Sequence, residues 1–142
     1  MIREFTTGDE KGIAELEKEC FSIPWSENAV LESAAADTVF FVFCENGKIL
    51  GYAGLQVVLD EGYITNIAVT ASARGRGIGK ALADALINFG KGKNLAFISL
   101  EVRESNTPAI SLYTKCGFKD CGKRKSFYQN PKEDAIIMTK EF

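Results

Sequence analysis

The most informative stretch of this sequence runs Arg74-Gly75-Arg76-Gly77-Ile78-Gly79-Lys80. Glycines let backbone N–H groups approach a ligand closely, and the apolar spacing after the loop predicts a helix that starts there. The free N–H groups and the dipole of a helix start favour a bound anion. The two arginines and the lysine add positive charge. The loop therefore suits a pyrophosphate, although an ordinary turn with exposed arginines could have the same composition.

The glycine spacing differs from those of two common phosphate-binding loops. It is G-x-G-x-G, whereas dinucleotide-binding folds use G-x-G-x-x-G. It also lacks the four-residue gap and the following Ser or Thr of a P-loop. The loop alone therefore indicates a phosphate-bearing ligand without identifying it.

On both sides of the loop, periodic apolar residues predict an α/β fold with helices packed on a sheet. Ser26 is expected to cap a helix, Thr107 to cap another before Pro108, and Gly117 to end that second helix. Asn46-Gly47 is typical of a tight hairpin. A first helix is expected around Ile13, Leu16, Cys20 and Phe21. Strands are predicted over residues 38–45, 48–60, 63–69, 96–103, 118–128 and 134–142.

Length and composition limit the possible functions. The 142 residues fit one domain, 1–142, and the net charge of -2 does not suggest a nucleic-acid binder. No N-terminal or internal apolar run is long enough for a signal peptide or a membrane span, so a cytoplasmic protein is expected. The four cysteines form no C-x-x-C pair, so we expect free thiols and no metal site.

The chain contains no histidine. This excludes Ser-His-Asp and Cys-His catalysis, so a general base must be a carboxylate, a lysine, a tyrosine or a water. Glu101 is the preferred candidate, because strand alternation turns it away from the apolar Leu100 and Val102. The alternative is a solvated strand face with a Glu101–Arg103 ion pair. Tyr113 is the candidate general acid, but it shares a helix face with Ile110 and could be simple packing.

Two motifs together resemble the signatures of the GNAT acetyltransferase superfamily. Ile67-Ala68-Val69 followed by Arg74-x-x-Gly77-x-Gly79 is similar to its coenzyme-A motif, and Asn106-x-x-Ala109-x-x-x-Tyr113-x-x-x-Gly117-Phe118 to its second signature. The resemblance implies a mixed, mostly antiparallel sheet of about six to seven strands flanked by about four helices. It also implies acetyl-CoA as co-substrate. The residues expected to bind it are Ile67, Ala68, Val69, Arg74, Gly75, Arg76, Gly77, Ile78, Gly79, Lys80 and Asn106.

Further stretches resemble the RimI-type ribosomal-protein alanine N-acetyltransferases within that superfamily. They include Pro24-Trp25-Ser26-Glu27 and Glu133-Asp134-Ala135-Ile136-Ile137-Met138, and the resemblance covers nearly the whole chain. It implies that Glu101 is the general base, acting through a water, and that Tyr113 protonates the departing coenzyme-A sulfur. The acceptor groove is expected to consist of the loop from Phe21 to Ser26 and the turn near Phe127-Tyr128, with Trp25, Ser26 and Tyr128 as the substrate-binding residues. Phe127 stands where many relatives have tyrosine.

The resemblance makes the N-terminal alanine of a small-subunit ribosomal protein the expected acceptor. Deprotonating an α-amine at pH 7 costs about 1.4 kcal/mol and a lysine about 4.6 kcal/mol, so a single glutamate suits the α-amine better. The alternatives are a GNAT enzyme for a polyamine, an aminoglycoside or a protein lysine, and an idle acyl-CoA-binding module. The Pro-Trp-Ser-Glu loop argues against a small amine, and the presence of both Glu101 and Tyr113 argues against the idle module.

Overall fold

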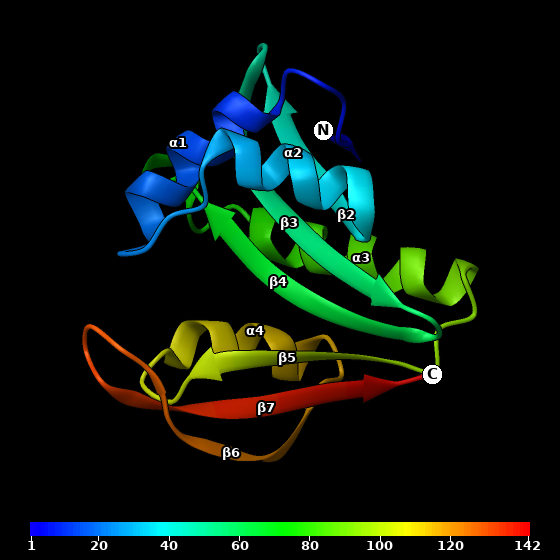
Figure 1. Cartoon of the computed structure of the whole chain (residues 1–142), viewed down its shortest axis with the longest axis vertical. Coiled ribbons are helices and arrows are strands. Elements are labelled where there is room, and N and C mark those ends of the chain that lie inside the picture. Colours follow the sequence, from blue (N-terminus) through cyan, green and yellow to red (C-terminus); the bar gives the residue numbers. More distant parts are fainter.

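The computed structural model describes all 142 residues and contains one seven-stranded sheet in the order β1-β2-β3-β4-β5-β7-β6 (Figure 1). Only the β4–β5 pair is parallel, and every other neighbouring pair is antiparallel. The expected mixed, mostly antiparallel sheet is therefore confirmed. The strands are β1 (Ile2–Glu4), β2 (Thr38–Glu45), β3 (Lys48–Val58), β4 (Glu61–Val69), β5 (Phe97–Arg103), β6 (Lys119–Tyr128) and β7 (Glu133–Glu141).

Four helices cover the two faces of the sheet (Figure 1). On one face, α1 and α2 pack on β2, β3 and β4 around a cluster that includes Ile13, Val30 and Phe40. On the other face, α3 and α4 contribute to a larger cluster that includes Leu82 and Tyr113. None of the helices has the length and apolar content needed to cross a bilayer. The helices are α1 (Glu10–Cys20), α2 (Glu27–Ala36), α3 (Ile78–Gly92) and α4 (Thr107–Lys115).

Local sequence signals explain several element boundaries. The Ser26 hydroxyl accepts a hydrogen bond from the Ala29 N–H at 3.1 Å, which confirms it as the cap of α2. Asn46 and Gly47 both have positive φ, 53° and 76°, as a tight hairpin requires. Gly117 also has positive φ, 95°, and ends α4 as expected.

Some expectations were wrong. The N-cap of α4 is Asn106, whose side-chain oxygen accepts from the Ala109 N–H, and Thr107 is the first helical residue. The short strand β1 was not predicted, and neither was the 3₁₀ turn Ala71–Ala73. Three residues are too few for an alternating pattern, and β1 forms because it pairs with β2 along Phe41 to Phe43.

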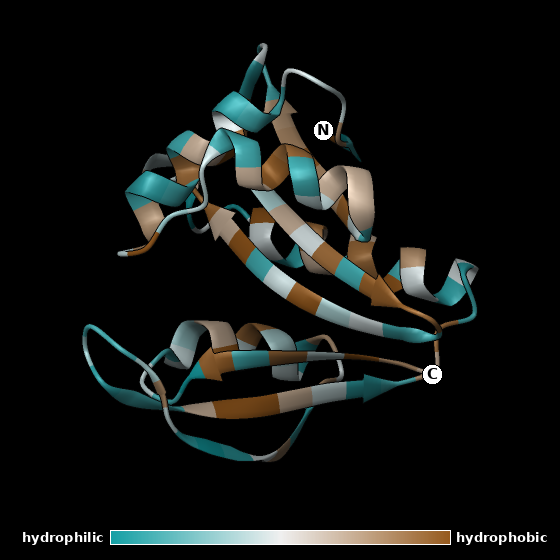
Figure 2. Cartoon of the chain, viewed as in Figure 1, coloured by the Kyte–Doolittle hydropathy of each residue, from teal (hydrophilic) through white to brown (hydrophobic).

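Burial differs strongly between the two strands at the end of the sheet. Strand β7 has an apolar centre that packs on the core, with Met138 fully buried, whereas β6 at the edge is exposed along almost all its length. Figure 2 shows this contrast as a brown centre in β7 and a mostly teal β6. A polar edge strand is expected, because an apolar one would invite pairing with other chains.

Candidate active site

Strands β4 and β5 are paired over only three residues and then separate. The paired stretches are Glu61–Tyr63 and Phe97–Ser99. Beyond them the two strands diverge, as Figure 1 shows for the green and yellow arrows. A register shift opposite Gly54 and Leu55 leaves Thr65 of β4 without a pairing partner in β3. A Cβ atom at Gly54 would collide with the Thr65 hydroxyl, so this irregularity needs a glycine opposite it.

One cleft lies beside the glycine loop, and we call it the glycine-loop cleft. Its volume is about 510 Å³, and it is bounded by β4, the loop, the start of α3 and α4. Most of the residues expected to bind the coenzyme line it, whereas Arg76 and Lys80 do not. The lining residues that the sequence predicted are Ile67, Ala68, Val69, Arg74, Gly75, Gly77, Ile78, Gly79 and Asn106.

The start of α3 presents unpaired N–H groups at this cleft. Gly75 and Gly77 have φ of 83° and 80°, in the left-handed region that favours glycine. The first backbone hydrogen bond of α3 runs from the Ala81 N–H to the Gly77 carbonyl. The N–H groups of Ile78 and Gly79 therefore have no partner in the chain. These donors and the helix dipole fit the pyrophosphate of a coenzyme.

The three cations of the loop differ in their contacts. Arg74 donates to the Val69 carbonyl at 3.1 Å and lines the cleft. Arg76 forms a 2.6 Å ion pair with Glu45, and Lys80 a 2.8 Å ion pair with Asp84, one turn along α3. The side chains of Arg76 and Lys80 thus contact carboxylates, and coenzyme contact by these two residues stays a prediction.

A second cleft, of about 440 Å³, lies between β4, β5 and the strands β6 and β7, and we call it the Glu101 cleft. Glu101, Tyr113, Asn106 and Tyr128 all line it. These four predicted residues come from β5, α4, β6 and the cap of α4, and the structure brings them together in one cleft. The residues that line both clefts, and so join them, are Phe21, Ile67, Asn106, Ala109 and Tyr113.

Glu101 has one carboxylate oxygen in a weak ion pair and the other free. Its Oε1 lies 3.7 Å from a guanidinium nitrogen of Arg124, and its Oε2 is buried without a hydrogen-bond partner. Arg103 makes no pair with it, because Arg103 bonds to Glu133 at 3.3 Å and to the carbonyls of Gln129 and Pro131. The alternative of a Glu101–Arg103 pair is therefore wrong. An unpartnered carboxylate oxygen in a cleft can accept a proton or hold a water.

Tyr113 is buried at the point where the two clefts meet. Its ring packs edge-on against Phe118, with the centroids 5.6 Å apart, so it does belong to the core. Its hydroxyl, however, has no hydrogen-bond partner in the chain. Burial raises the pKa of Tyr113 above its ordinary value, and Cys116 and Tyr128 add to that shift. The phenol therefore stays protonated at neutral pH and can serve as a proton donor.

Asn106 reaches both clefts from the start of α4. Its Oδ1 accepts the Ala109 N–H at 3.3 Å, so the local cap is real. That bond uses the oxygen only, and the amide N–H₂ remains able to donate. Helix capping and a coenzyme contact are thus compatible at this residue, and the contact itself stays a prediction.

The three residues expected to contact the acceptor occupy different surroundings. Tyr128 lines the Glu101 cleft and lies under the Arg103 guanidinium, 4.5 Å from the ring centroid. Trp25 packs edge-on against Phe40, and Ser26 caps α2. Trp25 and Ser26 line neither cleft, so their contact with an acceptor stays a prediction without support from these contacts.

Several lining residues of the Glu101 cleft were not singled out from the sequence. Tyr63, Thr65 and Asn66 come from β4, whereas Phe21, which follows α1, begins the loop that was expected to form the acceptor groove. Arg124 comes from β6. Strand alternation along β4 could have indicated Tyr63. Thr65 and Asn66 are consecutive, yet both line the cleft because of the pairing irregularity. Such an irregularity has no signal in the local sequence.

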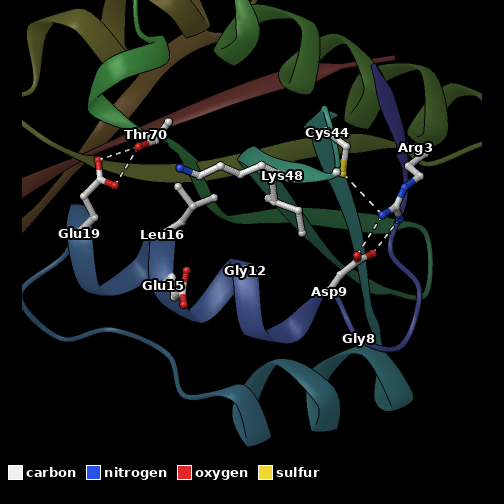
Figure 3. A pocket seen from close by; sticks show the side chains of 12 residues that line it. Arg3, Gly8, Asp9, Gly12, Glu15, Leu16, Glu19, Cys44, Lys48 and Thr70 are labelled. Atoms are coloured by element: carbon white, nitrogen blue, oxygen red, sulfur yellow. Dashed lines mark hydrogen bonds and ion pairs between the residues drawn. The ribbon is translucent and has the colours of Figure 1, made fainter.

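A third cavity, of about 560 Å³, is lined by residues of α1, β2 and β3, among others, and is drawn in Figure 3. It shares no lining residue with the two clefts. The Arg3–Asp9 ion pair, at 2.8 Å, crosses one end of it. At the other end Glu19 accepts a hydrogen bond from Thr70 at 2.9 Å. None of the predicted site residues lines this cavity. At each end, the polar side chains pair with one another, Arg3 with Asp9 and Thr70 with Glu19.

Residues 11–118 match the model of the acetyltransferase (GNAT) family. The [ribosomal protein bS18]-alanine N-acetyltransferase of Escherichia coli (strain K12) is 36% identical over 139 residues, which cover 96% of this chain and 94% of that protein. The enzyme of the same name from Haemophilus influenzae is 35% identical over 141 residues, 97% and 96% of the two chains. The crystal structure of the ribosomal-protein-S18-alanine N-acetyltransferase from Escherichia coli superposes with a TM-score of 0.91 at 35% identity, covering 99% and 92% of the two chains.

Proposed function

Because the chain belongs to the GNAT acetyltransferase family, we propose that it transfers an acetyl group from acetyl-CoA to the N-terminal α-amine of an alanine in a small-subunit ribosomal protein. One observation carries the proposal. The similarity to enzymes named for that reaction extends over 96% of this chain rather than over the coenzyme motif alone. A motif shared by many acetyltransferases would specify only the co-substrate.

The glycine-loop cleft is the proposed binding site for acetyl-CoA. The unpaired N–H groups of Ile78 and Gly79 would hold the pyrophosphate, and the backbone of Ile67, Ala68 and Val69 would border the rest of the coenzyme. Acetyl-CoA supplies the acetyl thioester. Because Phe21, Asn106 and Tyr113 line both clefts, a thioester held in one cleft would face an amine held in the other.

Glu101 is the proposed general base. Glu101 lines the cleft, and its Oε2 is buried with no hydrogen-bond partner, so the carboxylate is not committed to another group of the chain. It would take a proton from the incoming ammonium directly or through a water. Loss of that proton leaves the amine with a lone pair for attack on the thioester carbonyl carbon. The carbon–nitrogen bond then forms as the carbon–sulfur bond breaks.

Tyr113 is the proposed general acid. The departing sulfur needs a proton, and the Tyr113 hydroxyl has no partner in the chain that would compete for its hydrogen. A high pKa keeps the phenol protonated until the sulfur leaves. A phenol of pKa about 10 or higher protonates a thiolate only when it is held close to it, which the rigid packing on Phe118 favours.

The chemistry of the proposed acceptor suits a single general base. An α-amine costs about 3 kcal/mol less than a lysine to deprotonate at neutral pH, which suits a single carboxylate. The proposal makes the ribosomal protein N-terminus the partner, requires no nucleic acid or membrane, and sets the reaction in the cytoplasm.

An acetyl-transfer assay tests the proposal. The acceptors are a peptide with a free N-terminal alanine and basic downstream residues, its N-blocked twin and spermidine. We expect acetylation of the first alone, measured as released thiol and as added mass on the N-terminal residue. Acetylation of the blocked twin would indicate a lysine acceptor, and preference for spermidine would indicate a small-amine enzyme. Either result would overturn the proposed acceptor.

A further inference from the structure

A fully buried carboxylate, Glu17 of α1, lies behind the Glu101 cleft. It accepts hydrogen bonds from the Trp25 N–H at 2.9 Å, the Tyr52 hydroxyl at 2.6 Å and the Asn66 amide at 3.2 Å. No lysine or arginine contacts it. Burial raises the pKa of the Glu17 carboxyl, while these three hydrogen bonds act in the opposite direction. Helical spacing explains its burial, because Glu17 follows Ile13 by four residues on the apolar face of α1.

The carboxylate of Glu17 fixes which end of the Asn66 amide faces it. A carboxylate oxygen only accepts hydrogen bonds, so Asn66 must turn its N–H₂ group toward Oε2 of Glu17. The carbonyl oxygen Oδ1 then points away from Glu17, and no group of the chain donates to it. Asn66 is also part of the lining of the Glu101 cleft. Its free end in that cleft is therefore a hydrogen-bond acceptor.

Asn66 and Glu101 belong to β4 and β5, the two strands that border the opening, and both line the Glu101 cleft. The last β4–β5 pair is Tyr63 with Ser99, and Glu101 lies two residues beyond it in β5. Asn66 lies three residues beyond it in β4, and the unpaired Thr65 takes up one of those three. The two residues are thus at similar depth on opposite walls of the same cleft.

We propose that Oδ1 of Asn66 accepts an N–H of the acceptor amine, and that Glu17 is a positioning residue that holds the amide in that orientation. The inference rests on the proposed function, because it requires an amine in the Glu101 cleft. An ammonium has three N–H bonds. It loses one proton before attack and a second as the amide forms, and the third stays on nitrogen in the product. Asn66 would hold that retained N–H and so direct the lone pair toward the thioester.

A reciprocal exchange of side chains tests the positioning role. In Glu17→Gln, the Trp25 N–H can only donate, so it takes the new amide oxygen. The new N–H₂ group then faces Asn66, which must flip and present its own N–H₂ to the cleft. In Asn66→Asp, two carboxylates face each other. In the double variant Glu17→Gln/Asn66→Asp, the introduced glutamine would donate from its side-chain nitrogen to one oxygen of the introduced aspartate, whose other oxygen would face the cleft. Only the double variant restores both the buried contact and the acceptor oxygen.

The readout is the KM for the alanine peptide at saturating acetyl-CoA. Loss of one hydrogen bond to a charged amine predicts a rise of roughly tenfold in Glu17→Gln. The double variant should return to within about threefold of wild type, since a typical hydrogen bond is restored. Asp37→Asn is the matched control, because Asp37 also accepts from a side-chain amide, that of Gln56 at 2.9 Å, but lies outside the cleft. Its KM should not change.

A second acceptor separates contact with the amine from general damage to the site. An N-methylalanine peptide has no N–H left after transfer, so wild type should disfavour it relative to alanine. Asn66→Ala should reduce that preference by roughly tenfold, the loss expected for one hydrogen bond. An unchanged preference would mean that Asn66 does not touch the reacting nitrogen.

Nuclear magnetic resonance of the Asn66 side-chain amide needs no acceptor. Its ¹⁵N-bound protons should exchange slowly in wild type and quickly in Glu17→Gln, where they face the cleft. Equal exchange in the two proteins would overturn the positioning role, as would a double variant no better than Glu17→Gln. If wild type acetylates no N-terminal alanine, the proposed function fails, and the contact of Asn66 with that amine fails with it. The exchange rates still decide whether Glu17 orients the Asn66 amide.

Discussion

The guanidinium of Arg124 lies 3.7 Å from Oε1 of Glu101, while Oε2 of the same carboxylate is buried with no partner. Arg124 is more than half exposed, and such an ion pair contributes at most about 1 kcal/mol in water. An incoming ammonium can therefore displace it. The two oxygens of Glu101 thus differ, with one beside an exposed surface cation and the other buried without a partner.

Replacing Glu101 by glutamine should slow acetyl transfer strongly. The amide keeps the size of the side chain but cannot take up a proton, and loss of a general base typically costs about 10²–10⁴-fold in rate. The affinity for acetyl-CoA should stay nearly unchanged, because Glu101 does not line the glycine-loop cleft. Steady-state kinetics with the alanine peptide and calorimetry with acetyl-CoA measure the two quantities.

Glu104→Gln is the control for that experiment. Glu104 follows the same strand, but it is exposed and pairs with Lys123. Its replacement should leave the rate close to that of wild type. A loss of less than threefold in Glu101→Gln at neutral pH would show that Glu101 is structural.

Gly77→Val should abolish detectable binding of acetyl-CoA. Gly77 has φ of 80°, a conformation that a β-branched residue adopts only with strain, and it is the N-cap of α3. The variant should therefore displace the N–H groups that are expected to hold the pyrophosphate. Calorimetry measures the affinity. Gly92→Ala, at the other end of α3 with open space around it, should bind normally. Wild-type affinity in Gly77→Val would mean that the coenzyme binds elsewhere.

The sequence predicted features that depend on neighbouring residues. Asn46-Gly47, Ser26 and Gly117 act through their own backbone or the next turn, and each has the expected role. The strand ends were misplaced by one or two residues, as for β3, which ends at Val58 rather than at residue 60. Hydrogen bonding between strands, which local patterns do not encode, sets such ends.

Features that depend on distant contacts were not predictable. The apolar spacing of α1 puts Glu17 on the buried face, yet its partners Tyr52 and Asn66 lie 35 and 49 residues away. Arg124 joins the cleft only because β6 lies at the sheet edge next to β7. The motifs predicted Glu101 and Tyr113, whereas the lining around them required the three-dimensional arrangement of the strands.

Asp9→Asn should destabilise the fold at neutral pH by about 1 kcal/mol, since one charged hydrogen-bonded contact near the surface is lost. Asp9 accepts two bonds from Arg3, at 2.8 and 3.0 Å, and one from the Thr6 N–H at 2.8 Å. The hydrogen bond from Arg3 lowers the pKa of Asp9. A lowered folded-state pKa means that this stabilisation is present above the unfolded pKa, about 3.9, and is lost as pH falls through the folded value.

Thermal unfolding of wild type and Asp9→Asn between pH 7 and pH 2.5 measures that dependence. The two melting temperatures should differ at pH 7 and converge in acid. Glu45→Gln serves as the control, because Glu45 and Arg76 are both over 40% exposed and their ion pair contributes little. A constant difference between wild type and Asp9→Asn at all pH values would mean that ionisation of Asp9 is irrelevant to stability.

Tyr113→Phe separates the observed packing of this residue in the core from its proposed role as proton donor. The ring packs on Phe118 in the core, and the substitution keeps that ring, so the fold should be retained. Only the hydroxyl is lost, and the leaving sulfur would then depart without its proton donor. That change affects the transition state more than the bound substrate, so kcat and kcat/KM should fall together.

The dependence of that loss on pH distinguishes proton donation from packing. The phenol of wild type stays protonated in alkali, because burial raises the pKa of Tyr113. The free thiolate, however, becomes a less costly leaving species as pH approaches the thiol pKa of about 8.5, so the deficit of Tyr113→Phe should shrink there. Rates measured from pH 6 to pH 9.5, under conditions where chemistry limits turnover, give the comparison. If the variant matches wild type throughout, Tyr113 only packs in the core and the proton comes from water.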